Sequence, residues 1–115
     1  MRADPVLPIS IDVLDHQINL KRRGGAVRVA ILSTSDFNAV QKIDAQTLTF
    51  GRTGIEASVV SCNHSRDVNH DGVRDLVCEF DVNETGLQSG DTIAILQGRT
   101  TEGLFIRGSD TIKIK

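Results

Sequence analysis

The stretch Asp67-Val68-Asn69-His70-Asp71-Gly72-Val73-Arg74-Asp75 lies between two segments of strand-forming residues. Residues 57–62, Ala-Ser-Val-Val-Ser-Cys, precede it, and residues 76–80, Leu-Val-Cys-Glu-Phe, follow it. Such segments favour β-strands over helices. The sequence therefore predicts a hairpin of two strands joined by a polar loop, and it points to an all-β chain.

The polar loop has the spacing of a calcium-binding loop. Oxygen-bearing side chains stand at its first, third, fifth and ninth places, and glycine stands at the sixth. Calcium takes six to eight oxygen ligands, and a glycine at the sharpest bend lets alternate side chains point at one ion. The pattern predicts a Ca²⁺ site formed by the side chains of Asp67, Asn69, Asp71 and Asp75 and the backbone carbonyl of Val73.

The loop departs from an EF-hand, because its twelfth place is Cys78 rather than glutamate and its flanks do not have a helical pattern. The alternative interpretation is a turn that binds nothing, since Asp, Asn and Gly are common turn formers. Four oxygen acceptors in register with a glycine favour calcium over the empty turn.

Composition limits the class of protein. The 115 residues suffice for one domain, which we expect to span 1–115. The net charge of −2 argues against nucleic-acid binding. The sequence has no apolar run long enough for a membrane span and no apolar core of a signal peptide near Met1. We interpret the chain as a domain excised from a larger exported protein.

The sequence also argues against two kinds of site. It contains four Phe but no Trp or Tyr, so the aromatic platforms that stack on sugars or bases are not available. No candidate nucleophile has a neighbouring base in a recognisable arrangement, which predicts that the chain is not an enzyme.

Short apolar segments recur at intervals of roughly ten residues between turn-forming residues. This pattern predicts an antiparallel β-sandwich, Ig-like or jelly-roll-like, of about eight short strands. One or two helical turns are expected in 37–43, and a single turn is expected in 44–47. The expected extended segments are 9–14, 18–21, 26–32, 48–50, 55–62, 76–80, 91–98, 104–108 and 111–114.

Cys62 and Cys78 lie symmetrically about the middle of the predicted loop. Opposite residues of antiparallel strands have Cβ atoms about 4.5–5.5 Å apart, and a disulfide needs about 3.5–4.5 Å. A disulfide is therefore plausible, and the alternative is two buried free thiols. A zinc site is disfavoured, because the cysteines do not form a Cys-x-x-Cys pair and His64 and His70 lack partners at zinc-ligand spacing.

The sequence resembles a β-domain that recurs in secreted bacterial proteins, often near their C-termini. The stretches that carry the resemblance cover nearly the whole chain: Ile9-Ser-Ile-Asp-Val13, Ile18-Asn-Leu-Lys21, Val29-Ala-Ile-Leu32, Asp36-Phe37, Ile43-Asp44, Thr47-Leu48-x-Phe50-Gly51, Asp67-Val-Asn-x-Asp-Gly72, Asp75-Leu-Val77, Thr85-Gly-Leu87, Gly90-Asp-Thr92, Leu96-x-Gly98 and Gly108-Ser-Asp110.

This resemblance implies an extracellular or cell-surface setting and a calcium ion in the loop 67–75. The chain departs from the family at Cys78, where an aliphatic residue is usual, so the family does not imply the disulfide. We therefore expect a non-catalytic, calcium-stabilised accessory module. The alternative is a module that binds a carbohydrate or a protein partner through calcium and polar loops.

Overall fold

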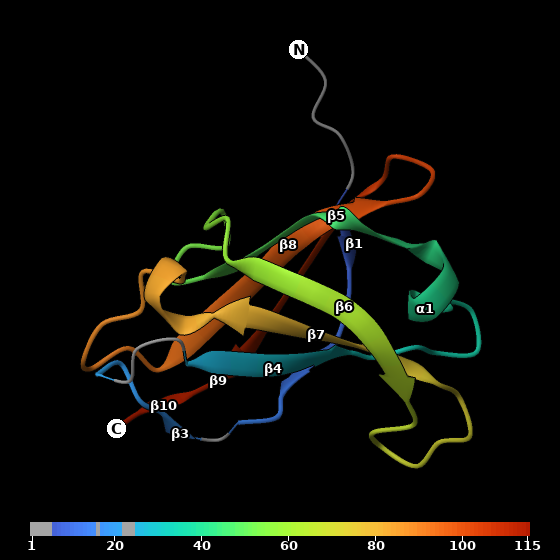
Figure 1. Ribbon diagram of the computed structural model, residues 1–115. Helices are drawn as coiled ribbons and strands as arrows, with labels where there is room; N and C mark the ends of the chain where they lie inside the picture. Colours follow the sequence, from blue (N-terminus) through green and yellow to red (C-terminus); the bar gives the residue numbers. More distant parts are fainter. Residues whose placement is uncertain (1–5, 16, 22–24) are drawn as a thin grey trace.

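The apolar segments of the sequence form two four-stranded sheets that pack as a sandwich (Figure 1). The computed structural model describes residues 6–15, 17–21 and 25–115. In spatial order, one sheet contains β1 (Val6–Pro8), β9 (Phe105–Thr111), β8 (Ile93–Thr100) and β5 (Ile43–Gly51). The other contains β2 (Ile11–Val13), β4 (Ala26–Ile31), β7 (Asp75–Asp81) and β6 (Val59–Arg66).

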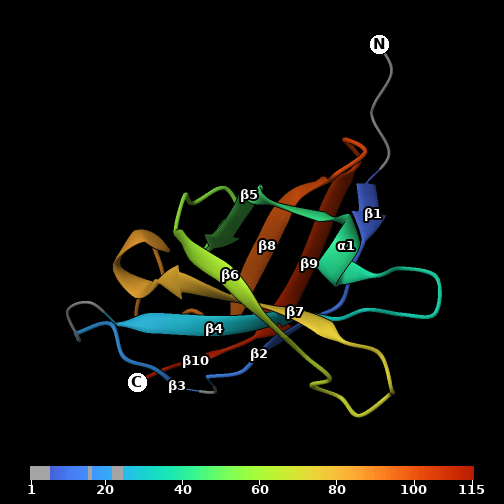
Figure 2. The same ribbon diagram turned by 45° about the vertical axis from the view of Figure 1, so that its right-hand side comes forward.

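The expected sandwich is confirmed, and most strand pairs are antiparallel. Two pairs are parallel. β1 pairs with β9, and β3 (Gln17–Ile18) pairs with β10 (Lys113–Ile114). The start of the chain thus passes from one sheet to the other, because β1 belongs to the β9 sheet and β2 pairs with β4 (Figure 2).

Alternation along the strands sends one set of side chains into the space between the sheets. From β4 these are Val27, Val29 and Ile31, each at most 1% exposed. β5 and β7 contribute Phe50 and Phe80, whose ring centroids lie 4.8 Å apart. Full burial of a side chain of this size stabilises a fold by about 1.5–3 kcal/mol, so these residues dominate the packing that holds the sheets together.

Helical structure is limited to two short segments in the described part of the chain. The helix expected in 37–43 is α1 (Ala39–Lys42), and the side chain of Asn38 caps it by accepting a hydrogen bond from the Gln41 N–H. A 3-10 turn, η1 (Val82–Glu84), follows β7. Ten strands are described instead of about eight: nine of them overlap the expected extended segments, and β1 lies before the first of these segments.

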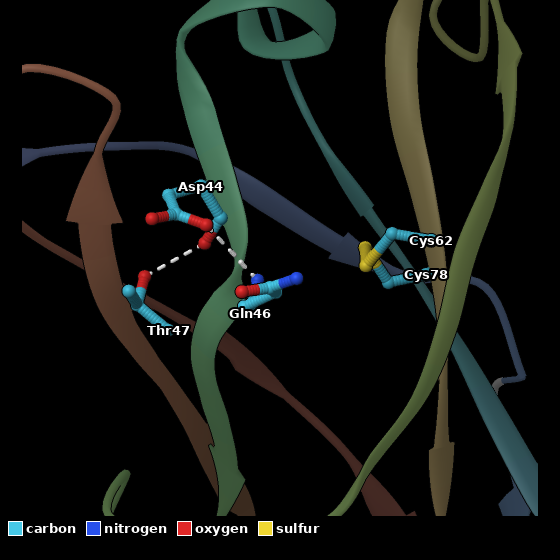
Figure 3. Close-up of a disulfide and its surroundings, with 5 residues drawn as sticks. All are labelled: Asp44, Gln46, Thr47, Cys62 and Cys78. Carbon is cyan, nitrogen blue, oxygen red and sulfur yellow. Dashed lines mark hydrogen bonds between the residues drawn. A yellow bond between two sulfur atoms is a disulfide. The ribbon is translucent and has the colours of Figure 1, made fainter.

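The prediction of a separate turn in 44–47 was wrong, because these residues lie within β5. The turn-forming bonds nevertheless exist: Thr47 Oγ1 donates to the Asp44 carbonyl at 2.7 Å, and the Gln46 N–H donates to Asp44 Oδ1 at 3.2 Å (Figure 3). They coincide with a shift of the β5–β8 register between Asp44 and Thr49. The local preference for a turn therefore appears as an irregularity in a longer strand.

Candidate metal centre

The predicted loop connects β6 to β7 and projects from the end of their sheet (Figures 1 and 2). Three antiparallel pairs lead up to it, ending with Arg66 opposite Asp75. Strand pairing therefore fixes the two ends of the loop, and the conformation of residues 67–74 depends on bonds made within the loop and at its base.

Asp67 organises the first half of the loop. Its carboxylate accepts hydrogen bonds from the Asp71 N–H at 3.1 Å and the Gly72 N–H at 2.8 Å. The chain can bend back in this way because His70 and Gly72 have φ of 60° and 87°, in the left-handed region that suits glycine at Gly72. The Gly72 N–H bond is the main cause that lowers the pKa of Asp67. Its carboxylate thus stays ionised to lower pH and remains available to a cation.

Asn69 and Asp71 turn toward Asp67. One end of the Asn69 carboxamide lies 3.1 Å from Asp71 Oδ1 and 3.2 Å from Asp67 Oδ1. Its NH₂ group in that position donates to both carboxylates, and a half turn of the amide presents its oxygen there instead. Oxygens that share a calcium ion at 2.3–2.6 Å lie about 2.7–3.7 Å from one another. The three side chains therefore fit a calcium ion when the amide oxygen faces the carboxylates.

Asp75 lies at the base of the loop and is fully buried. Its Oδ1 accepts from the Ser33 N–H at 2.8 Å, and its Oδ2 accepts from the Val68 N–H at 2.9 Å. These two bonds compensate the cost of burying the carboxylate. Each carboxylate oxygen has a second lone pair, so Asp75 retains acceptor capacity while it ties the loop to the connection after β4.

The structure thus gathers Asp67, Asn69 and Asp71, and it does not bring Asp75 into one group with the two other acids. The Val73 N–H donates to Asp71 Oδ1 at 2.9 Å. This bond fixes the peptide between Gly72 and Val73, next to the Val73 carbonyl that is the predicted ligand. Within residues 6–15, 17–21 and 25–115, no three His, Cys, Asp or Glu side chains lie close enough together to hold a metal ion. Any site here therefore depends on the Asn69 amide and on backbone oxygen.

The Cys62–Cys78 disulfide is present, which confirms the predicted pairing and makes the free-thiol alternative wrong (Figure 3). The two Cα atoms lie 4.0 Å apart. The register expected for this pair holds at Ser61 opposite Glu79, and it then shifts before His64 opposite Val77. Cys78 is fully buried in the core and Cys62 packs against it, so the bridge joins β6 to β7 on the inner side of the sheet.

Ser33 is a contributor that the sequence did not reveal. It lies two residues after the end of β4, is 2% exposed, and donates its N–H to Asp75 and its hydroxyl to the Arg74 carbonyl. In the sequence it belongs to a run of Ser and Thr that is typical of any loop. Only the packing of the β4–α1 connection against the start of β7 makes Ser33 part of the site.

No family model, curated protein or solved structure matches the chain. The resemblance to a β-domain of secreted bacterial proteins therefore stays a prediction that depends on this chain's own residues. Among the helices in the described segments, none has the length and apolar character needed to cross a membrane.

Proposed function

We propose that this chain is a non-catalytic, calcium-binding and calcium-stabilised module of an extracellular or cell-surface protein. The observation that carries the proposal is the approach of the Asn69 carboxamide to within 3.2 Å of both Asp67 and Asp71 at the tip of the β6–β7 hairpin. Asp67, Asn69, Asp71 and the Val73 carbonyl would hold the ion, and Asp75 would anchor the base of the loop through its bonds to the Ser33 and Val68 N–H groups.

Bound calcium would neutralise carboxylates that otherwise repel each other in one short loop. An ion that binds only the folded state stabilises it by RT ln(1 + [L]/Kd), about 2.7 kcal/mol at 100 times Kd. Calcium loops of extracellular modules have Kd values of about 10⁻⁴–10⁻³ M. A site of that affinity would fill in calcium-rich extracellular fluid, so we propose that the ion locks the hairpin after export.

The disulfide supports the proposed location. Disulfides persist in oxidising compartments and are rare where thiols are kept reduced. Cys62 and Cys78 enclose the loop completely, and a covalent link of this kind holds its two strands together whether or not an ion is bound. The bridge and the ion would then act on the same hairpin through different physical effects.

We further propose that the sandwich is Ig-like rather than jelly-roll-like. The order β2-β4-β7-β6 corresponds to strands A, B, E and D of an Ig domain, and β5-β8-β9 corresponds to C, F and G. The disulfide differs from the usual Ig bridge because it joins neighbouring strands of one sheet. NMR contacts that placed β5 beside β6 in a single sheet would contradict this assignment.

Calorimetric titration with Ca²⁺ tests the calcium proposal. We expect the wild type to bind one ion, and we expect Asp71→Ala to lose binding because it removes a carboxylate at the Asn69 amide. Asp36→Ala is the matched control, since Asp36 is an exposed acid outside the loop. Addition of EDTA should lower the melting temperature of the wild type and of Asp36→Ala, and leave that of Asp71→Ala unchanged.

Two results would contradict the proposal. The first is a wild type that releases no heat with Ca²⁺ at millimolar concentration and melts at the same temperature in EDTA. The second is an Asp71→Ala variant that binds the ion as tightly as Asp36→Ala does. Mg²⁺ is the ionic control, because it requires a smaller octahedral cage and should bind more weakly.

A second candidate function is protein binding, and a surface patch favours it. On the outer face of the β9 sheet, Val6 lies opposite Phe105, and both side chains are exposed. The Arg99 guanidinium lies 4.2 Å from the Phe105 ring centroid, beside a hollow of about 140 Å³ that Thr47 and Gln97 help to line. A partner bound here should be lost in Phe105→Ser and retained in EDTA, whereas carbohydrate held through calcium should be released by chelation.

A further inference from the structure

The connection after β4 contains a buried hydrogen-bonded group centred on Ser33. The Ser33 hydroxyl donates to the Arg74 carbonyl at 2.7 Å and accepts from the Ala39 N–H at 2.8 Å. The Ser33 N–H donates to Asp75 Oδ1 at 2.8 Å. Ser33 is 2% exposed, and Asp75 and Ala39 are fully buried. One small residue therefore joins the end of the acidic loop to the first residue of α1.

These bonds involve segments that are distant in the sequence. Ser33 and Asp75 are separated by 42 positions, and α1 begins six residues after Ser33. Removal of the hydroxyl would leave the Ala39 N–H and one lone pair of the Arg74 carbonyl without this partner in a buried place. Because unsatisfied buried groups are costly, the position of the loop base and the position of α1 depend on each other.

We propose that Ser33 is a positioning residue of the calcium loop and that it couples ion binding to the β4–α1 corner. The proposal depends on the calcium-binding function proposed above. Ser33 touches no ion itself. It fixes the Arg74 carbonyl and the Asp75 carboxylate, and Asp75 in turn holds the Val68 N–H near the start of the loop. Such outer partners orient metal ligands, and their loss commonly lowers metal affinity 10–100-fold.

Coupling of this kind is reciprocal. If Ser33 improves the affinity of the loop for calcium, then bound calcium must stabilise the arrangement that Ser33 holds, by the same factor. The corner that responds consists of Ser33 and the single turn of α1, whose Lys42 N–H donates to the Asn38 carbonyl at 2.8 Å. We therefore expect that calcium binding in the loop makes local unfolding of α1 less frequent.

Calorimetry of Ser33→Ala tests the coupling, with Ser58→Ala as the matched control. Ser58 is also a buried serine, 1% exposed, and its hydroxyl donates to the Phe50 carbonyl at 2.6 Å, away from the loop. Both variants lose one buried hydroxyl and should be destabilised. We expect the Kd for Ca²⁺ to rise 10–100-fold in Ser33→Ala and to change less than twofold in Ser58→Ala.

Hydrogen exchange of the wild type and of the two variants supplies a second test. Ca²⁺ should slow exchange of the Gln41 and Lys42 amides in α1, and the slowing should persist in Ser58→Ala and disappear in Ser33→Ala. Equal calcium affinities in the two variants, or α1 exchange in the wild type that ignores calcium, would overturn the coupling while the calcium site itself stands. A wild type that binds no calcium would overturn both proposals.

Discussion

The β8–β9 and β6–β7 hairpins each join two neighbouring antiparallel strands, but they differ in strand pairing and in the residues that close the turn. β8 and β9 pair without interruption from Ile93 opposite Thr111 to Arg99 opposite Phe105, and a short turn joins them. β6 and β7 pair with two register shifts, and the loop between them contains clustered carboxylates. The β8–β9 hairpin is regular and has a short turn, whereas the β6–β7 hairpin is irregular and has a loop that contains several charged side chains.

The difference lies in what satisfies the turn. In the β8–β9 turn, the Gly103 N–H donates to the Thr100 carbonyl at 2.9 Å and the Thr100 N–H donates to the Leu104 carbonyl at 2.8 Å. In the β6–β7 loop, side-chain carboxylates of Asp67, Asp71 and Asp75 accept the backbone N–H groups. The Thr100 hydroxyl oxygen also accepts from the Glu102 and Leu104 N–H groups, so the acceptors of the β8–β9 turn are neutral. A loop closed by ionised acids depends in addition on charge, on a covalent bridge and, as we propose, on a cation.

The largest effect expected is from Asp75→Ala. The substitution removes two charge-assisted hydrogen bonds and leaves the Ser33 and Val68 N–H groups without their partner. At about 1.5–3 kcal/mol for each bond to a charged group, the loss of two such bonds should lower the unfolding free energy by about 3–6 kcal/mol. Urea denaturation measures it. The exposed Asp36→Ala should stay within about 0.5 kcal/mol of the wild type, and an equal response of both variants would show that Asp75 does not anchor the loop.

Reduction of the disulfide should have the next largest effect. The Cys62–Cys78 bridge spans a sequence separation of 16 residues, and in the chain-entropy model a loop of this length contributes about 3 kcal/mol. Denaturation with and without dithiothreitol gives the difference. Because the bridge lies in the irregular hairpin, mild reduction should speed amide exchange in β6 before it does so in β8. An unchanged midpoint would mean that pairing and packing alone hold β6 in place.

The sequence predicted the parts of the irregular hairpin that depend on local pattern. The order of oxygen-bearing residues located the loop, the strand-forming residues of 76–80 identified β7, and the symmetry of the cysteines indicated the bridge. Each of these follows from periodicity within one hairpin. The extent of β5 was missed, because Asp44 and Thr47 favour a turn locally and only the neighbouring β8 draws them into a strand.

The role of Ser33 could not be predicted for a different reason. Its bonds to Arg74 and Asp75 depend on how the end of β4 packs beside the start of β7, with Ile31 opposite Leu76. A sequence shows the bonding capacity of a serine but not which distant group will meet it. The same holds for the Phe105 and Arg99 pair, which cross-strand register brings together.

Asn69→Asp tests the contribution of charge in the acidic loop. The change replaces an amide that can donate to Asp67 and Asp71 by a third carboxylate beside them. Without calcium the variant should therefore melt below the wild type, because its loop repels itself. With calcium it should bind about tenfold more tightly, or about 1.4 kcal/mol, since affinity rises with ligand charge. Melting curves in EDTA and in Ca²⁺ test both halves, and a variant weaker in both conditions would argue against a cation among these oxygens.

The smallest effect separates the two hairpins most directly, because each contains a glycine in the same conformation. Gly72 in the acidic loop and Gly103 in the β8–β9 turn both have φ of 87°, and a Cβ added at either would meet nothing within 4 Å. Alanine at each position should therefore cost a similar amount in backbone strain, about 1 kcal/mol. For Gly103→Ala that cost should be the same in EDTA and in Ca²⁺. For Gly72→Ala it should grow in Ca²⁺, since a loop strained at its bend holds the ligands less well. If calcium changes the stability of the two variants by the same amount, then the conformation of the acidic loop does not depend on a bound ion. The two hairpins would then differ in sequence but not in their need for a cation.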